Sequence, residues 1–203
     1  MISMKAVVAV ASIVSRLWGC DTLASLSAPD CARLRTAGFG WRAGYIDHVT
    51  PEELADQLSA GLAFAPVTYA LELDATHIVA RLVALGIPKG VTVWLDIERV
   101  GAALDPVDLT ARINACSKAL VDAGFSCGVY VGAGCPLDEA ALFALPYVSR
   151  YWHSCSDVPR VRTRGYCVRQ LRPNDVIVEG EDIDGDIVEP DYKGGLPVFA
   201  AAA

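Results

Sequence analysis

The chain lacks the sequence signatures of several common catalytic and binding sites. Its seven cysteines include no C-x-x-C pair, and its three histidines show no metal-ligand spacing, so we expect no metal centre. No glycine-rich loop follows the first predicted strand, which argues against a doubly wound nucleotide-binding sheet. No Gly-x-Ser-x-Gly elbow is present, so serine hydrolase chemistry has no support in the sequence.

Positive charge is also scarce. The 203 residues carry 17 Lys and Arg against 24 Asp and Glu, which gives a net charge of −7. Because DNA and RNA require a basic surface, this balance argues against a nucleic-acid partner. Hydrophobic residues make up 53% of the chain, which is enough for the sizeable core of one folded domain.

The first 16 residues allow two interpretations. Lys5 precedes an apolar run over 6–14 that resembles a weak signal peptide, and this run is too short to span a membrane. Residues 1–16 are therefore either a signal-like segment or an N-terminal extension, such as an extra strand or helix leading into the domain. In an exported protein, Cys155 and Cys167 could form a disulfide, because they flank one predicted loop.

Glycine and proline divide the chain into repeating β/α units. Thr50 and Asp105 each precede a proline, which is typical of an N-cap at a helix start, and Glu53 completes a predicted capping box. Four other places combine a helix end, a glycine suited to the left-handed C-cap and an apolar strand start. These junctions are 37–39, 60–62, 85–87 and 123–125.

This punctuation predicts an α/β protein with a single TIM-like barrel over residues 17–192, built from five β/α units plus three further strands. The predicted strands are nearly continuously apolar, as parallel strands covered on both faces should be. No convincing helix follows residue 146, and residues 193–203 are predicted to form a flexible tail. The predicted strands are 17–21, 41–46, 62–69, 91–98, 125–131, 147–152, 165–171 and 182–188.

The segment Val91–Glu98 carries the most informative pattern in the chain. Side chains alternate along a strand, so Trp94, Asp96 and Glu98 should share one face. Two acids at the end of a buried strand are costly, and we expect one of them to have the raised pKa that suits general acid catalysis. The simpler alternative is a strand that ends in solvated acids. We interpret Trp94 as a core residue rather than a sugar platform.

Other polar and aromatic side chains also lie at predicted strand ends, where the active site of a parallel barrel forms. A glycosidase needs an acid to protonate the leaving oxygen, a carboxylate to stabilise positive charge on the sugar, and flat rings for stacking. The chain offers this set at Asp21, Tyr69, Asp96, Glu98, Tyr130, Trp152, Gln170 and Asp184.

Taken in order along the chain, several short motifs resemble those of the family 25 glycoside hydrolases, the lysozyme-type muramidases of bacteria and phages, and of a related glycoside-hydrolase-like domain. The resemblance extends from about residue 18 to 188. It implies a barrel of five β/α units plus three strands, and cleavage of the β-1,4 bond between N-acetylmuramic acid and N-acetylglucosamine. The motifs are Gly19-Cys20-Asp21-Thr22, Arg42-Ala43-Gly44-Tyr45, Leu95-Asp96-Ile97-Glu98, Gly128-Val129-Tyr130, Arg169-Gln170-Leu171 and Asp182-Ile183-Asp184.

The resemblance also implies roles for individual residues. Glu98 would be the general acid/base of a retaining, two-carboxylate mechanism. Asp96 would stabilise the charged intermediate, with or without help from the substrate's own acetamide. Asp21 and Asp184 would bind sugar or water, and no cofactor is required. Substrate binding is expected at Tyr69, Tyr130, Trp152, Gln170 and Asp182.

Other interpretations remain open at this stage. The barrel could belong to a catalytically inactive carbohydrate-binding protein or a virion or cell-surface structural protein. The acidic run 179–186 resembles part of a calcium loop without its closing glutamate. It can also be a solvated acidic turn, or it can carry the catalytic aspartate, for which Asp182, Asp184 and Asp186 are all candidates. A partner such as peptidoglycan or another polysaccharide implies an extracellular, cell-wall or virion location. The sequence leaves the oligomeric state open.

Overall fold

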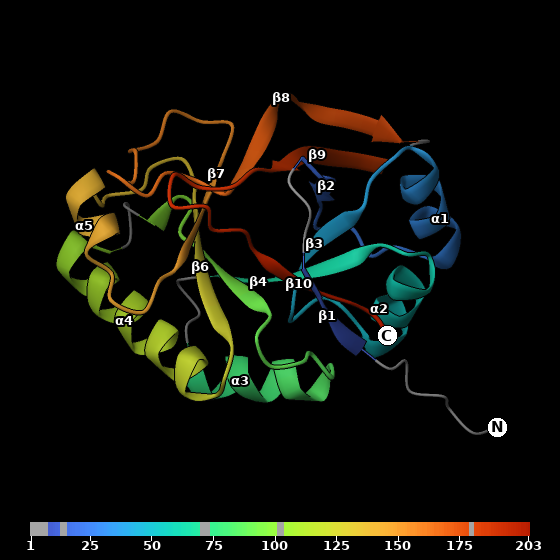
Figure 1. The fold of residues 1–203 in the computed structure, drawn as a ribbon, viewed down its shortest axis with the longest axis horizontal. Helices are drawn as coiled ribbons and strands as arrows, with labels where there is room; N and C mark the ends of the chain where they lie inside the picture. The colour runs from blue at the N-terminus through green and yellow to red at the C-terminus, as the bar shows by residue number, and fades with distance from the viewer. Residues whose placement is uncertain (1–7, 13–15, 70–73, 101–103, 179–180) are drawn as a thin grey trace.

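Eight strands close into a barrel in the computed structural model of the chain (Figure 1). The structure describes residues 8–12, 16–69, 74–100, 104–178 and 181–203, with the backbone alone for 172–178, 181 and 182. The helices are α1 (Ala28–Thr36), α2 (Pro51–Ser59), α3 (Ala75–Ala84), α4 (Pro106–Asp122) and α5 (Glu139–Phe143). The strands are β1 (Val8–Ser12), β2 (Trp18–Asp21), β3 (Trp41–Tyr45), β4 (Ala63–Tyr69), β5 (Thr92–Asp96), β6 (Ser126–Val131), β7 (Arg150–His153), β8 (Val168–Val178), β9 (Glu181–Val188) and β10 (Val198–Ala202).

The strand order confirms the predicted architecture. Strands β2 to β8 pair in parallel, each with the next along the chain, and β9 closes the barrel by pairing antiparallel with both β8 and β2. Each of β2 to β6 is followed by one of the helices α1 to α5, which flank the barrel in Figure 1. The barrel therefore consists of five β/α units plus the three strands β7, β8 and β9, with β1 and β10 as additional strands.

The predicted helix signals are also found in the structure, with one exception. Thr50 and Asp105 are N-caps whose side chains accept backbone N–H groups, and the glycines at the four predicted junctions have φ between 72° and 100°. Glu53 does not complete a capping box. Its carboxylate is buried and instead accepts hydrogen bonds from Arg42 and from the backbone N–H of Leu26, both at 2.9 Å.

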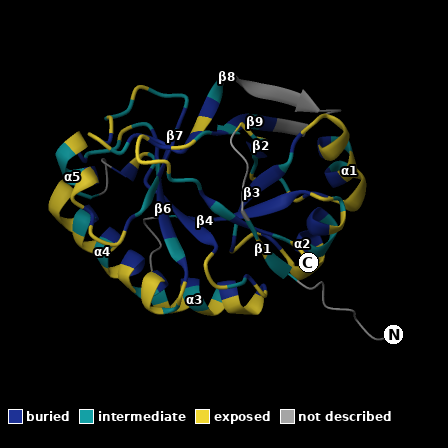
Figure 2. Ribbon diagram, viewed as in Figure 1, coloured by how far each residue is buried: buried dark blue, intermediate teal, exposed yellow. Residues whose placement is uncertain are grey.

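Apolar side chains form one layer outside the barrel and another layer inside it. Residues facing outward from the strands pack against the helices, so the strands are buried and the helices are exposed on their outer side (Figure 2). Residues facing inward fill the barrel with three tryptophans, Trp41, Trp94 and Trp152. Trp94 is fully buried, in agreement with its interpretation as a core residue. A close approach makes this filling possible, because a Cβ at Gly128 would lie 2.5 Å from the Trp94 ring.

The prediction of a flexible tail over 193–203 is wrong for the last residues of the chain, because Val198–Ala202 form β10. This strand pairs antiparallel with all of β1 and meets β4 at Ala200. Phe199 is fully buried, with its ring 4.7 Å from that of Trp41, and the Val198 N–H donates to Thr92 Oγ1 at 3.0 Å. Trp41 and Thr92 begin their strands, so β10 covers the amino end of the barrel. The sequence pattern suggested a tail because a short alanine-rich segment carries little strand signal.

Two further observations concern export and membranes. The Cys167 thiol donates to the Tyr151 carbonyl at 3.5 Å, and no disulfide joins it to Cys155. In the part of the chain that the structure describes, no helix has the length and apolar character needed to cross a bilayer.

Replacing Phe199 by alanine should lower the free energy of unfolding by about 3–5 kcal/mol, because the change leaves a cavity at the closed end of the barrel. Urea denaturation followed by tryptophan fluorescence measures this loss. Val83→Ala is the control, since Val83 is 66% exposed on α3 and its truncation should cost less than about 0.5 kcal/mol. Equal losses in the two variants would show that β10 does not seal the barrel.

Candidate active site

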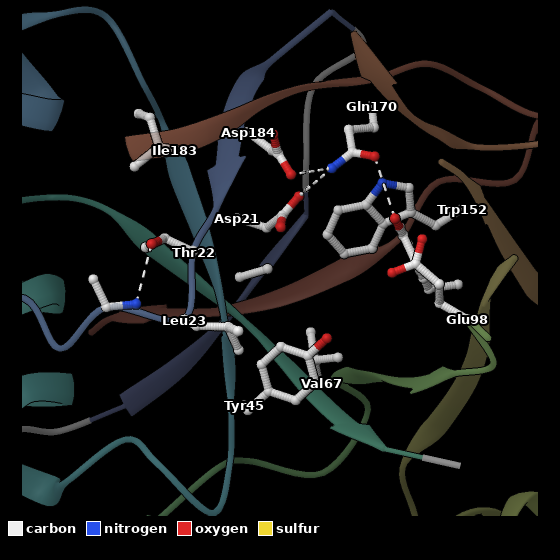
Figure 3. A pocket seen from close by; sticks show the side chains of 13 residues that line it. Asp21, Thr22, Leu23, Tyr45, Val67, Glu98, Trp152, Gln170, Ile183 and Asp184 are labelled. Carbon is white, nitrogen blue, oxygen red and sulfur yellow. Dashed lines mark hydrogen bonds between the residues drawn. The ribbon is translucent and has the colours of Figure 1, made fainter. Parts of the chain in front are cut away.

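A cavity of about 580 Å³ opens at the carboxyl end of the barrel, opposite β10 (Figure 3). Strand ends and the loop after β2 form its wall, as expected for a barrel in which the strands point toward the site. The wall contains several residues predicted from the sequence: Asp21, Glu98, Tyr130, Trp152, Gln170 and Asp184. The remaining wall residues are Thr22, Leu23, Ala24, Ala43, Tyr45, Val67 and Ile183.

Asp96 and Glu98 lie next to each other at the end of β5. Asp96 is 5% exposed, and both of its carboxylate oxygens accept hydrogen bonds. The Tyr45 hydroxyl donates to Oδ2 at 2.6 Å, and the Glu98 backbone N–H donates to Oδ1 at 2.7 Å. This arrangement fixes the carboxylate of Asp96 and places Glu98 in the turn that follows, with its side chain on the cavity wall.

The raised pKa expected for one of the two acids belongs to Asp96. Burial raises the pKa of Asp96 to about 6, and the negative charge of Glu98 contributes in the same direction. The hydrogen bonds from Tyr45 and from the Glu98 N–H oppose this effect because they stabilise the ionised form. Asp96 is consequently ionised at pH 7 and can stabilise a positive charge.

A strained turn holds Glu98 against the loop after β6. Arg99 has a φ of 56°, a left-handed conformation that costs about 1–2 kcal/mol for a residue with a side chain. Its N–H donates to the Ala133 carbonyl at 2.7 Å, and the Ala133 N–H donates to Glu98 Oε1 at 3.4 Å. A Cβ at Gly132 would lie 2.3 Å from the Glu98 Cβ, so this close approach requires glycine.

A second group of acids lies where β2 pairs with β9. The register places Asp21 opposite Asp184 and Gly19 opposite Asp186. Asp186 is fully buried, and its Oδ1 accepts a hydrogen bond from Trp152 Nε1 at 3.0 Å. Asp186 Oδ2 is buried without a nitrogen or hydroxyl donor among the described residues. Its contact with the Asp21 carboxyl is a hydrogen bond only when one of the two acids carries a proton.

Burial determines the protonation of this pair. It raises the pKa of Asp21 to about 7 and that of Asp186 well above its usual range. The negative charge of Asp21 raises the pKa of Asp186 further, whereas the hydrogen bond from Asp186 lowers the pKa of Asp21, and the charge of Asp184 raises the pKa of both. Asp21 and Asp186 therefore share a proton near neutral pH.

Gln170 joins the acids to the aromatic side of the cavity. Its Nε2 donates to Asp21 Oδ2 at 3.2 Å and to Asp184 Oδ2 at 2.7 Å. Its Oε1 accepts from the Tyr130 hydroxyl at 3.2 Å and from the Cys155 N–H at 3.0 Å. In Figure 3 these bonds connect Gln170 with Asp21 and Asp184 beside Trp152.

The aromatic residues occupy different depths. Tyr130 lines the cavity and meets Trp152 edge-on at 5.2 Å. Trp152 also lines the cavity but is only 1% exposed, so it contributes an edge rather than an open stacking face. Tyr69 is not among the wall residues of the described chain, and its ring stacks on that of Tyr45 at 4.2 Å.

A buried ion pair outside the barrel fixes the loop after β2. Arg42 and Glu53 are almost completely buried and meet at 2.9 Å. Arg42 also donates to the Ala24 carbonyl at 2.7 Å, while Glu53 accepts the Leu26 N–H. Since Ala24 lines the cavity, this pair holds one wall of the site in place.

The sequence analysis gave Tyr45 no role, left Asp186 as one of three candidate acids, and named Asp182, whose side chain is not described. Tyr45 was noted only as part of a motif, and its position at the end of β3 was the available signal. Asp186 was one of several candidate acids on β9, and its distinguishing feature is its complete burial. Asp182 belongs to β9, but its side chain lies outside the described residues.

No metal-binding cluster of three or more His, Cys, Asp or Glu residues occurs within the described ranges. The calcium interpretation of the run 179–186 rests partly on residues 179 and 180, which lie outside those ranges. Chemically, the described site offers a carboxyl group on an open wall, a fixed neighbouring carboxylate, and further acids that share a proton.

The fold has known counterparts among solved structures. No protein-family model and no curated protein matches the chain. An uncharacterized protein from B. stearothermophilus aligns with a TM-score of 0.66 at 20% identity, over 89% of this chain and 99% of that one. A family 25 glycosyl hydrolase from Bacillus anthracis aligns with a TM-score of 0.63 at 12% identity, over 85% of this chain and 88% of that one. The chain therefore has a glycoside hydrolase-like barrel fold.

The shared proton predicts how stability depends on pH. Asp21 and Asp186 bind protons more tightly in the folded than in the unfolded chain, so their contribution to stability is complete below about pH 3.8 and is lost as the pH rises through about 7. Asp186→Asn should flatten this pH dependence, because asparagine does not titrate. Urea denaturation at several pH values measures it, and Asp157→Asn, at an exposed site, is the control. Parallel profiles for wild type and Asp186→Asn would contradict proton sharing.

Proposed function

We propose that the protein is a retaining glycoside hydrolase that cleaves peptidoglycan as an N-acetylmuramidase. The observation that carries this proposal is the position of Glu98 on an open cavity wall beside Asp96, which is buried and fixed by Tyr45. Glycosidic cleavage requires such a combination of a proton donor and a charge-stabilising carboxylate. The family 25-like fold supports the same assignment.

In the proposed reaction, Glu98 donates a proton to the glycosidic oxygen while the bond to the anomeric carbon breaks. The leaving sugar then departs as a neutral alcohol. Positive charge develops on the remaining sugar, and the ionised Asp96 stabilises it or orients the substrate's acetamide oxygen to attack. The Glu98 carboxylate next takes a proton from water and becomes an acid again. The water oxygen bonds to the anomeric carbon with retained configuration, and where the acetamide oxygen has bonded to that carbon, this bond breaks at the same step and the acetamide is restored.

Other wall residues would hold the glycan. Asp21 and Asp184 lie on the side of the cavity formed by β2 and β9, where they can accept hydrogen bonds from sugar hydroxyls or a bound water. Tyr130 can offer part of its ring to a sugar face. A peptidoglycan substrate implies action outside the cytoplasm, at the cell wall or from a virion.

Glu98→Gln should reduce the release of muropeptides from purified peptidoglycan by about 10²- to 10⁴-fold, because glutamine cannot donate a proton to the leaving oxygen. Mass spectrometry of the released fragments, with identification of the new reducing ends, measures this effect. Fragments ending in reducing N-acetylmuramic acid are expected from the wild type. Glu52→Gln, on the exposed start of α2, is the matched control and should retain full activity.

Absence of release by folded wild-type protein from several peptidoglycans would contradict the proposed function. Retained sugar binding without release would then favour the non-catalytic carbohydrate-binding alternative. Release of fragments ending in reducing N-acetylglucosamine would preserve glycosidase activity but contradict the proposed linkage.

Tyr45→Phe should move the acidic limb of the kcat profile to higher pH by about one unit. Cleavage requires ionised Asp96, whose pKa is about 6, and the Tyr45 hydroxyl lowers that pKa by donating to the carboxylate. Losing a hydrogen bond to a charged group changes such an equilibrium by about tenfold. Tyr147→Phe, on the protein surface, is the control. An acidic limb at the same pH in Tyr45→Phe and wild type would show that the ionisation of Asp96 does not determine this limb.

A further inference from the structure

The side-chain amide of Gln170 has no hydrogen-bonding capacity left for a ligand. An amide group has two N–H donors and a carbonyl oxygen that accepts two hydrogen bonds. Gln170 donates to Asp21 and Asp184 and accepts from the Tyr130 hydroxyl and the Cys155 N–H. Its side chain comes from β8 and is nearly buried, with 8% of the residue exposed. All four capacities are therefore satisfied within the protein.

The orientation of this amide is fixed by a group that cannot change its role. A backbone N–H can only donate, so the atom of Gln170 that faces the Cys155 N–H must be the oxygen. The NH₂ group must then face Asp21 and Asp184, where both carboxylate oxygens accept. A flipped amide would place an oxygen against these acids and a donor against the Cys155 N–H.

We infer that Gln170 is a positioning residue that acts through Asp21 and Asp184 and does not itself bind the sugar. This inference rests on the proposed function where it concerns turnover, and on contacts within the protein where it concerns the acids. It replaces the sequence-based assignment of Gln170 as a substrate ligand. Gln170 belongs to β8, and the two acids that it contacts belong to β2 and β9. Its hydrogen bonds therefore join these three strands at the cavity.

The same contacts locate the proton that Asp21 and Asp186 share. Gln170 donates a hydrogen bond to Asp21 Oδ2, and Trp152 donates one to Asp186 Oδ1. The remaining oxygens are Asp21 Oδ1 and Asp186 Oδ2, and the latter is buried with no other donor among the described side chains. Asp186 Oδ2 is therefore the oxygen of this acid that is left for the shared proton. The titratable groups that act on the pKa of Asp21 are Asp96, Asp184 and Asp186. The negative charge of Asp21 in turn raises the pKa of Cys20, Tyr45 and Tyr130.

Gln170→Met tests this positioning role without requiring turnover. Methionine fills similar space but cannot donate, so ionised Asp21 loses a stabilising hydrogen bond, and the pKa of Asp21 should rise by about one unit above its wild-type value of about 7. Carbon-13 NMR titration of the Asp21 carboxyl, assigned with Asp21→Asn, measures this change. Arg169→Met is the matched control, because Arg169 is the preceding residue on β8 and its side chain is 46% exposed.

Kinetics with peptidoglycan fragments provide a second readout. Because Asp21 and Asp184 are proposed to hold the glycan, their displacement in Gln170→Met should lower kcat/KM by about 10- to 100-fold. Gln170→Glu should recover part of this loss at acidic pH, because a protonated glutamic acid can again donate to one of the acids. This recovery should disappear as the pH rises and the new carboxyl ionises. A purely structural defect would not produce such a pH-dependent rescue.

The outcomes separate this inference from the proposed function. An unchanged Asp21 titration in folded Gln170→Met, or an unchanged kcat/KM, would overturn the positioning role while leaving the glycosidase proposal in place. If the wild-type protein releases nothing but the pKa of Asp21 is raised in Gln170→Met, the proposed function is wrong and the positioning of the acids by Gln170 is confirmed. If Gln170→Met does not fold, the titration is made in Gln170→Glu, where the added negative charge should also raise the pKa of Asp21.

Discussion

The burial of several carboxyl groups at one end of a barrel is the constraint on which the site depends. Asp96 and Asp186 are almost completely removed from water, and the donors that reach them are neutral: a tyrosine hydroxyl, an indole and a backbone N–H. Neutral donors compensate only part of the cost of ionising a buried acid. The acids therefore differ in protonation, with Asp96 ionised at pH 7 and a proton shared by Asp21 and Asp186.

The remainder of the fold maintains that environment. Three tryptophans fill the barrel below the cavity, and Phe199 from β10 closes its amino end, so the acids lie between a packed core and the cavity. On the outside, the buried pair of Arg42 and Glu53 fixes the loop after β2 through its backbone groups. Removing one member would leave an uncompensated buried charge, which is far more costly than losing a surface ion pair.

Within the site, the two groups of acids have different freedom to act. Glu98 lies on the cavity wall, and among the described residues its carboxylate accepts one long hydrogen bond, from the Ala133 N–H. Asp96 and Gln170 are surrounded by protein partners and serve to fix charge and geometry. A solved family 25 glycosyl hydrolase from Bacillus anthracis has the same barrel fold at 12% identity, which shows how little sequence this architecture requires.

The sequence by itself determined the β/α punctuation, the barrel and the set of acids at the strand ends. Local features specify these: left-handed glycines, N-caps with proline, and the alternation that places Asp96 and Trp94 on one face. Only the tertiary structure decided the role of Glu53, the strand at 198–202, the contact between Tyr45 and Asp96, and which acid of β9 lies deepest. These depend on partners far away in the chain, since burial and hydrogen bonding between distant strands leave no local pattern.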